Sequence, residues 1–256
     1  MSSIRKLINQ TAIYGTSSII GRFLNFLLTP LYALQFSNEQ YGIITEMYAY
    51  VAFLVVFLTY GMETAFFRFS TTNKEGKINI YSNTLYSLIT TSAIFVAMAT
   101  IFSQNIADWL KYPNHKEYII WFSLIVSLDA VSSIPLAKLR LQEKAKKFAL
   151  VNLLNVGVNI FLNLFFLIYC KEAYESGHQN WITENLYNPE IGVGYVFISN
   201  LIASVIKFGV LMPTMSFKGT FDFTILKQMT NYAAPMLLVG LAYVVNETLD
   251  LSLIHI

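Results

Sequence analysis

The sequence feature that most constrains the fold is a succession of seven long apolar stretches. Each runs for about 20 residues or more, the length that an α-helix needs to cross the hydrocarbon core of a bilayer. None shows the alternation of apolar and polar residues that is typical of a barrel strand. The stretches are approximately Thr11–Leu34, Tyr41–Phe66, Ile78–Phe102, Tyr118–Ala137, Phe148–Cys170, Ile191–Pro213 and Tyr232–Leu251. The sequence therefore predicts an all-α fold, a polytopic integral membrane helical bundle with about seven transmembrane helices.

Too few charged residues are present to cover a soluble surface. Of the 256 residues, 12% are charged and 55% are hydrophobic, whereas a soluble domain has about 25% charged residues. The formal net charge of +2 gives no reason to expect a nucleic-acid partner. The single cysteine, Cys170, and three scattered histidines show no metal-ligand spacing, so we expect no metal site and no other cofactor. Composition favours the lipid bilayer as the main surroundings of the chain.

Basic residues between the apolar stretches predict the orientation of the chain. If the N-terminus is cytoplasmic, the inner segments contain most of the basic residues, namely Arg5, Lys6, Arg68, Lys74, Lys77, Lys138, Arg140, Lys144, Lys146, Lys147, Lys218 and Lys227. The outer segments contain only Lys111, Lys116 and Lys171. Cytoplasmic loops of membrane proteins carry such an excess of lysine and arginine. We therefore expect a multi-pass protein with a cytoplasmic N-terminus.

Polar side chains recur on one face of several apolar stretches. Residues three and four positions apart share a face of a helix. Such faces hold Thr11, Gly15, Ser18, Arg22, Asn25 and Thr29 in the first stretch, Asn152, Asn155, Asn159 and Asn163 in the fifth, and Asn200, Ser204 and Lys207 in the sixth. Polar groups at membrane depth normally face the interior of a bundle or a water-filled cavity. The pattern therefore predicts a polar, partly cationic cavity.

These residue types match a ligand that carries both a phosphate and sugars. The planar guanidinium of arginine binds phosphate bidentately, lysine adds a point charge, and asparagine offers both donors and acceptors to hydroxyl groups. The candidate substrate-binding residues are Arg22, Asn25, Lys207, Asn155, Asn159 and Asn200. The structural alternative is that the amides only join helices through hydrogen bonds, while Arg22 forms a buried ion pair with Asp129 that fixes helix register.

Three carboxylates within the apolar stretches are candidates for ion coupling. Asp129 lies near the middle of the fourth stretch, Glu46 toward the outer end of the second, and Glu247 in the seventh. Intramembrane carboxylates form the proton relays of pumps and transporters. We expect one of the three to bind a proton or a sodium ion, and all three stay open as candidates.

Four segments resemble the polysaccharide and O-antigen flippases of the multidrug/oligosaccharidyl-lipid/polysaccharide exporter superfamily. They are YGTSSIIGRFLNFLLTPLYALQFSNEQYGIITE, YGMETAFFRFS, KLRLQEKAKKFALVNLLNVGVNIFLNLFFL and LKQMTNYAAPMLLVGLAYVVNETLD. The resemblance lies in the order and spacing of these segments, and it covers the chain up to its last six residues.

The resemblance implies two lobes of helices, of which this chain holds the first. We expect residues 1–213 to form an N-terminal transmembrane lobe of six helices. Residues 214–250 are then a cytoplasmic linker and the first helix of a second lobe. The last residues, 251–256, read LSLIHI and resemble a translated sequencing-library adapter. We therefore expect the chain to be an N-terminal fragment with a non-native tail.

The resemblance also implies a transporter, and not an enzyme, that acts in surface polysaccharide biosynthesis, including that of lipopolysaccharide O-antigen. Such a protein is expected to flip a lipid-linked oligosaccharide, carried on undecaprenyl diphosphate, across the bacterial inner (plasma) membrane. The expected mechanism is alternating access around a cationic polar cavity. Arg22 best matches a position that engages the diphosphate, and Lys207 comes second.

Two other functions stay open. One is a drug or cation antiporter of the same superfamily, which Arg22 and Lys207 disfavour because their charges repel cationic drugs. The other is an integral membrane glycan polymerase or transferase, which needs catalytic groups outside the bilayer. The loop between Lys171 and Glu190 is the only candidate for these groups, and its carboxylates show no recognisable pairing or metal-ligand spacing.

Overall fold

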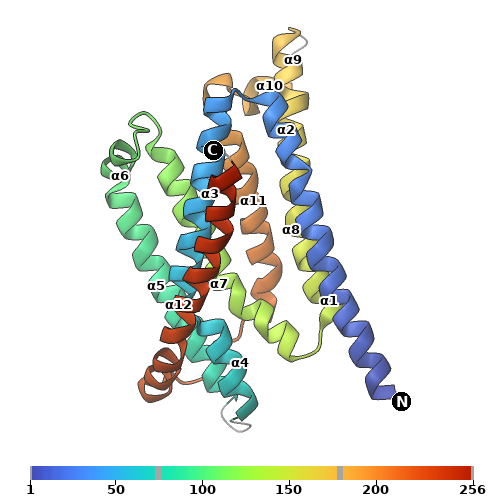
Figure 1. Ribbon diagram of the computed structural model, residues 1–256, viewed down its shortest axis with the longest axis vertical. Coiled ribbons are helices and arrows are strands. Elements are labelled where there is room, and N and C mark those ends of the chain that lie inside the picture. The colour runs from blue at the N-terminus through green and yellow to red at the C-terminus, as the bar shows by residue number, and fades with distance from the viewer. Residues whose placement is uncertain (1, 73–76, 178–180, 255–256) are drawn as a thin grey trace. The chain divides into compact units, whose positions relative to one another are not determined.

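The computed structural model describes residues 2–72, 77–177 and 181–254 (Figure 1). Side chains are described for these residues except 2–7, 9, 77–78, 182 and 247–254. Every regular element within the described ranges is a helix, which confirms the predicted all-α fold. The α-helices are α1 (Ser2–Phe26), α2 (Leu28–Gln35), α3 (Asn38–Thr59), α4 (Met62–Thr72), α5 (Lys77–Ile101), α6 (Ser103–Trp109), α7 (Lys116–Leu141), α8 (Ala145–Leu164), α9 (Lys171–Glu175), α10 (Trp181–Leu186), α11 (Gly194–Leu211) and α12 (Phe223–Ile254). A π-helix, η1 (Phe165–Cys170), and two 3₁₀-helices, η2 (Pro189–Ile191) and η3 (Met212–Thr214), complete the described elements.

Six helical segments among the described residues are long and apolar enough to cross a membrane. They are Gln10–Gln35, Asn38–Thr72, Asn79–Ile101, Lys116–Leu141, Ala145–Glu175 and Gly194–Thr214. These segments match the first six predicted stretches and confirm a polytopic membrane bundle. The seventh predicted stretch, Tyr232–Leu251, lies within α12, which is not among the six. Polar side chains such as Asn231 and Asn246 lower the hydropathy of α12, and the side chains from residue 247 onward lie outside the described part.

The chain forms two compact units. Unit 1 consists of Met1–Glu46 and Ala145–Lys207, and unit 2 of Met47–Lys144 and Phe208–Ile256. Both units draw on residues within the predicted lobe 1–213. The predicted boundaries separate expected lobes and not these compact units, so the boundaries stay a prediction.

Unit 1 is built around α1 and α8, which lie side by side (Figure 1). The Tyr14 and Phe148 rings meet edge to face with centroids 5.2 Å apart. Farther along, the space for a side chain at Gly21 adjoins Val156, 3.7 Å from its Cγ2. The residue numbers of the contacting positions increase together along both helices, so α1 and α8 run parallel. Gly21 brings the two helices close, as small residues do between membrane helices.

Aromatic stacking orders the segment between the fifth and sixth membrane-spanning helices. The Tyr187 ring stacks on Tyr195 at 5.2 Å, and Tyr195 stacks on Phe166 at 4.6 Å. Tyr174 of α9 also contacts Tyr187, with centroids 5.8 Å apart. Burial is the main cause that raises the pKa of Tyr187 to about 12, so its phenol stays neutral at physiological pH. The stack attaches this segment to the ends of η1 and α11.

Unit 2 packs α5 against α7, with α4 and α12 alongside. Its core includes Phe66 of α4, Leu85 of α5, Ile134 of α7 and Met229 of α12, each at most 1% exposed. The segment before α12 is attached to α5 by hydrogen bonds. The Gly219 N–H donates to Ser82 Oγ at 3.1 Å, and the Asp222 N–H donates to Asn83 Oδ1 at 2.8 Å. Ser82 and Asn83 of α5 therefore have a structural role.

Candidate functional site

Seven of the nine predicted site residues belong to unit 1. They are Arg22 and Asn25 on α1, Glu46 on α3, Asn155 and Asn159 on α8, and Asn200 and Lys207 on α11. Asp129 lies on α7 in unit 2, and the Glu247 side chain lies outside the described residues. The predicted substrate-binding residues therefore all come from one compact unit.

The contacts of α1 and α2 with α8 and α9 show which residues lie at the same depth. Tyr32 Oη donates to Asn163 Oδ1 at 3.0 Å, and Lys171 Nζ donates to Gln35 Oε1 at 3.0 Å. These two pairs join α2 to α8 and to α9, and their sequence separations are 131 and 136 positions. The separations of the two α1–α8 contacts, Tyr14–Phe148 and Gly21–Val156, lie between these values. Applied to α1, this offset places Arg22 level with the turn of α8 that contains Asn155. It places Asn25 level with the turn that contains Asn159.

Helix α11 brings its polar residues to the same depths. It runs in the opposite direction to α8 (Figure 1), and the Phe166–Tyr195 ring contact sets their relative height. At 1.5 Å per residue, Lys207 lies about 18 Å along α11 from this contact, and Asn155 lies about 16 Å along α8. By the same rise, Asn200 lies about 7.5 Å from the contact, between the heights of Asn159 and Asn163.

Unit 1 thus has two polar levels, which we name by their chemistry. The cationic level consists of Arg22, Asn155 and Lys207, and the amide level consists of Asn25, Asn159 and Asn200. The two asparagines of α8 place the levels one turn apart, about 6 Å along the helix. The levels compare heights along the helices, and that their side chains line one cavity stays a prediction.

The residues of the cationic level differ in exposure. Arg22 is exposed, whereas Lys207 is 8% exposed. The Asn155 side-chain oxygen is buried and has no hydrogen-bond partner among the described residues. An arginine at mid-bilayer costs about 2.5–3.5 kcal/mol on insertion scales, so an exposed Arg22 needs water or an anion beside it. The unpartnered Asn155 oxygen needs a donor, such as a hydroxyl group.

Hydrogen bonds give Asn163, and in part Asn159, a structural role on α8. Asn163 Nδ2 donates to the backbone oxygen of Asn159 at 2.8 Å and to its Oδ1 at 3.1 Å. Asn163 is fully buried and accepts the bond from Tyr32 that joins it to α2. The structural alternative, in which these amides only join helices through hydrogen bonds, therefore applies to Asn163 and in part to Asn159. The Asn155 side-chain oxygen, in contrast, accepts no hydrogen bond from the described residues.

The Tyr32–Asn163 bond makes a testable contribution to stability. Replacing Tyr32 by Phe leaves the buried Asn163 oxygen without this donor, so we expect a loss of about 1–3 kcal/mol in the free energy of unfolding. Thermal unfolding of the purified protein in detergent measures it. Tyr174→Phe is the control, because no hydrogen bond from its exposed hydroxyl is described. Equal melting temperatures for both variants would contradict the structural role of Asn163.

The predicted ion-coupling residues remain predictions. Glu46 and Asp129 are both half-buried, and they belong to different units. Arg22 and Asp129 also belong to different units, so the proposed resting ion pair between them stays a prediction. Among the described residues, no group of three or more His, Cys, Asp or Glu side chains could hold a metal ion.

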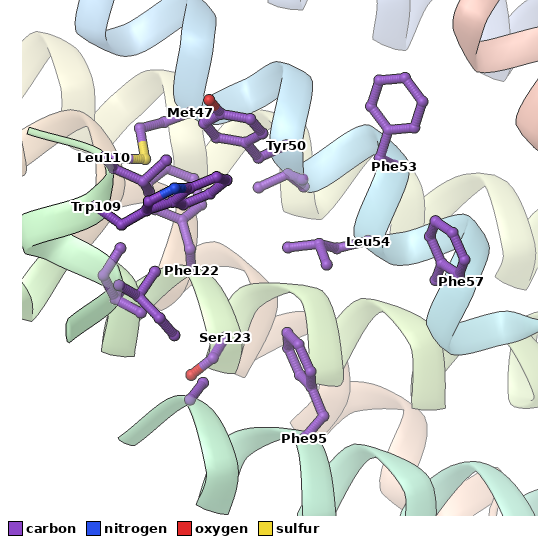
Figure 2. Close-up of a pocket in the computed structure, with 14 residues that line it drawn as sticks. Met47, Tyr50, Phe53, Leu54, Phe57, Phe95, Trp109, Leu110, Phe122 and Ser123 are labelled. Atoms are coloured by element: carbon purple, nitrogen blue, oxygen red, sulfur yellow. The ribbon is translucent and has the colours of Figure 1, made fainter. Parts of the chain in front are cut away.

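An apolar pocket in unit 2 was not predicted from the sequence. It has a volume of about 520 Å³ and is lined by residues of α3, α5, α6 and α7 and the turn after α6. Figure 2 shows the aromatic rings of Phe53, Phe57, Phe95, Trp109 and Phe122 around it. The polar groups of the lining side chains are limited to Ser123, the Tyr50 hydroxyl and the Trp109 ring nitrogen. Such a pocket fits a hydrocarbon chain and excludes ions.

Two basic residues at the other end of unit 2 have structural partners. Arg140 of α7 forms an ion pair with Glu63 of α4. The Arg68 guanidinium lies 4.2 Å from the centre of the Tyr232 ring on α12. Glu63 and Arg68 therefore each have a side-chain partner on another helix.

Comparison with known proteins gives one match. A family model described as polysaccharide biosynthesis protein matches residues 35–196, which is more than half of the chain. No curated protein and no solved structure matches the chain. The matched range includes Asn155 and Asn159 but excludes Arg22 and Lys207. The roles of these two cations therefore depend on the geometry of unit 1.

Proposed function

Since the chain belongs to the polysaccharide biosynthesis protein family, we propose that this multi-pass membrane protein flips a lipid-linked oligosaccharide. The substrate is a glycan on undecaprenyl diphosphate, which crosses from the inner to the outer leaflet of a bacterial inner membrane. The observation that carries the proposal is the cationic level of unit 1, one helical turn from the amide level. A diphosphate joined to a sugar needs these two kinds of group in adjacent places.

The chemistry of each level supports one part of the ligand. Arg22 provides a bidentate donor for a phosphate, and Lys207 provides a second positive charge. Asn25 is exposed on α1 and can both donate to and accept from sugar hydroxyls. The open acceptor of Asn155 suits a hydroxyl next to the phosphate. The predicted substrate-binding set thus becomes a diphosphate subsite and a glycan subsite.

The apolar pocket of unit 2 supports a substrate with a lipid carrier. Its lining of aromatic and aliphatic side chains suits a segment of the isoprenoid tail. The polar levels and this pocket belong to different units, so each supports the proposal independently. A neutral or cationic drug needs no cationic level, which favours the flippase over an antiporter.

Transport assays with reconstituted protein test the proposal. Protein expressed from the complete gene is placed in vesicles that contain labelled lipid-linked oligosaccharide. We expect the glycan to become accessible to an impermeant external reagent faster than in vesicles without protein. A proton or sodium gradient should change this rate if Asp129, Glu46 or Glu247 couples transport to an ion.

A second arm separates the alternatives. Export of a cationic dye from the same vesicles, without movement of the glycan lipid, would support an antiporter instead. Formation of longer glycans from the labelled substrate would support a polymerase. Glycan lipid movement equal to that in protein-free vesicles, with the protein shown to be folded, would overturn the flippase proposal.

A further inference from the structure

A second pocket lies at the opposite end of unit 2 from the apolar pocket. It has a volume of about 330 Å³ and is formed by α4, α5, the end of α7 and Ser216. Its polar lining residues are Ser70, Tyr81, Lys138, Gln142 and Ser216. We call it the Lys138 pocket. Ser123 lines the apolar pocket on the same helix as Lys138, and 15 residues of α7 separate the two by about 22 Å.

Lys138 supplies the positive charge of this pocket. Its Nζ donates to the backbone oxygen of Thr214 at 2.9 Å and lies 4.1 Å from the centre of the Tyr81 ring. An ammonium group has three N–H donors, and the Thr214 bond uses one of them. No ion pair between Lys138 and a described carboxylate is present, and Glu63 on the facing helix is paired with Arg140. The pocket therefore holds a positioned cation with donors to spare.

Ser70 supplies an unsatisfied hydroxyl in the same pocket. The residue is 1% exposed, and its Oγ has no hydrogen-bond partner among the described residues. Serine and threonine in helices usually donate to a carbonyl one turn back. The next two residues of α4 do so, since Thr71 donates to Phe67 and Thr72 to Arg68. A buried hydroxyl without a partner costs free energy, so Ser70 has a donor available for an acceptor that enters the pocket.

The pocket lies at a membrane–water interface. Lys138 is close to the end of the membrane-spanning segment Lys116–Leu141, and Tyr81 is close to the start of Asn79–Ile101. The excess of basic residues predicts that this end faces the cytoplasm. The hydrogen-bond donors of the pocket are the Lys138 ammonium group, the Ser70 hydroxyl and the side-chain amide of Gln142. Donors with no opposing carboxylate among the described side chains select an anion, and three or more of them at an interface suit phosphate oxygens.

We propose that the Lys138 pocket binds the phosphate group of a phosphorylated ligand. The ligand is either the headgroup of an anionic membrane lipid or a soluble phosphate ester, because both present the same oxygens. Lys138, Ser70 and the side-chain amide of the exposed lining residue Gln142 donate to these oxygens. This site is separate from the polar levels of unit 1, and the proposal does not depend on glycan transport.

Thermal unfolding of the purified protein tests the site with two probes. The first is inorganic phosphate, added to protein in a zwitterionic detergent. The second is phosphatidylglycerol, incorporated into phosphatidylcholine nanodiscs. We expect at least one probe to raise the melting temperature in a saturable way. Stabilisation by phosphatidylglycerol alone identifies a lipid headgroup as the ligand, and stabilisation by inorganic phosphate identifies a soluble phosphate ester.

Three variants separate a specific site from general charge effects. Lys138→Gln removes one charge-assisted donor, so the apparent Kd should rise about tenfold or more. Ser70→Ala should weaken binding several-fold, yet it should not lower the stability of the ligand-free protein, because it removes an unpaired polar atom. Lys227→Gln is the matched control, since Lys227 is an exposed lysine of the same unit. It should bind both probes like the wild type.

The Ser70 variant keeps the test decisive if Lys138→Gln does not fold. Unchanged binding in Ser70→Ala would overturn the proposal, because the orphan hydroxyl is its second independent support. The absence of stabilisation by either probe in the wild type would also overturn it. So would an equal loss of binding in Lys227→Gln and Lys138→Gln, since that result would show a diffuse charge effect.

Discussion

Replacement of Arg22 by Ala in the complete gene is expected to abolish surface glycan export while the amount of protein in the membrane stays normal. Arg22 is exposed on α1, so its loss removes no packing from the α1–α8 contact. The loss of two charge-assisted hydrogen bonds, each worth about 1.5–3 kcal/mol, weakens diphosphate binding at least about a hundredfold. Surface polysaccharide measured against immunoblotted membrane protein gives the result.

Two further variants distinguish a diphosphate ligand from a resting ion pair. Arg22→Lys should restore export only in part, because an ammonium group lacks the bidentate fork. If Arg22 served only to pair with Asp129, lysine would replace it fully and Asp129→Asn would reproduce the defect. Lys146→Ala is the matched control, since this exposed lysine lies on α8 below the polar levels. Wild-type export in Arg22→Ala would exclude the phosphate-binding role.

The membrane-spanning segments could be predicted because length and apolarity are sufficient to define them. The predicted Tyr118–Ala137 and the observed Lys116–Leu141 differ by a few residues at each end. Interruptions within a span were missed. Helix α1 ends at Phe26 and α2 begins at Leu28, just before Pro30, whose ring and missing N–H disturb the preceding turn of a helix. Hydropathy averages over such local backbone effects.

The sequence predicts the residues of the candidate site but not their arrangement, and their role stays a prediction. Helical spacing places Arg22 and Asn25 on one face, and the same rule groups the asparagines of α8. It cannot show that Asn163 accepts from Tyr32, because that contact joins residues 131 positions apart. The shared depth of Arg22, Asn155 and Lys207 likewise depends on contacts between helices.

Pockets formed by ordinary apolar residues have no sequence signal. Phe95 and Phe122 belong to stretches in which almost every residue is apolar, so nothing marks them as the lining of a cavity. Lys138 was interpreted only as one of many cytoplasmic charges. Its distinct role follows from Thr214 and Tyr81, which position its ammonium group, and from the unpaired hydroxyl of Ser70.

Gly61→Ala is expected to destabilise unit 2 strongly. Gly61 lies between α3 and α4 with φ of +72°, a conformation that L side chains rarely adopt. A Cβ there would lie 2.6 Å from the backbone oxygen of Ala233 and 3.0 Å from Met236 Cβ. Backbone strain alone costs about 1–3 kcal/mol. Displacing α12 from the buried Ala233 adds to it, so a total above about 4 kcal/mol is expected.

Two glycines separate the contributions of strain and contact in this prediction. Gly177 has φ of +74° with nothing within 4 Å, and Gly157 is helical with nothing within 4 Å. Gly177→Ala should therefore cost only the backbone strain, about 1–3 kcal/mol. Gly157→Ala should be neutral or stabilise the protein by up to about 1 kcal/mol, because alanine favours a helix. The order of melting temperatures in detergent should be Gly157→Ala, Gly177→Ala, Gly61→Ala from highest to lowest. If Gly61→Ala melted together with Gly177→Ala, α12 would not pack on the α3–α4 turn as closely as the 2.6 Å separation requires.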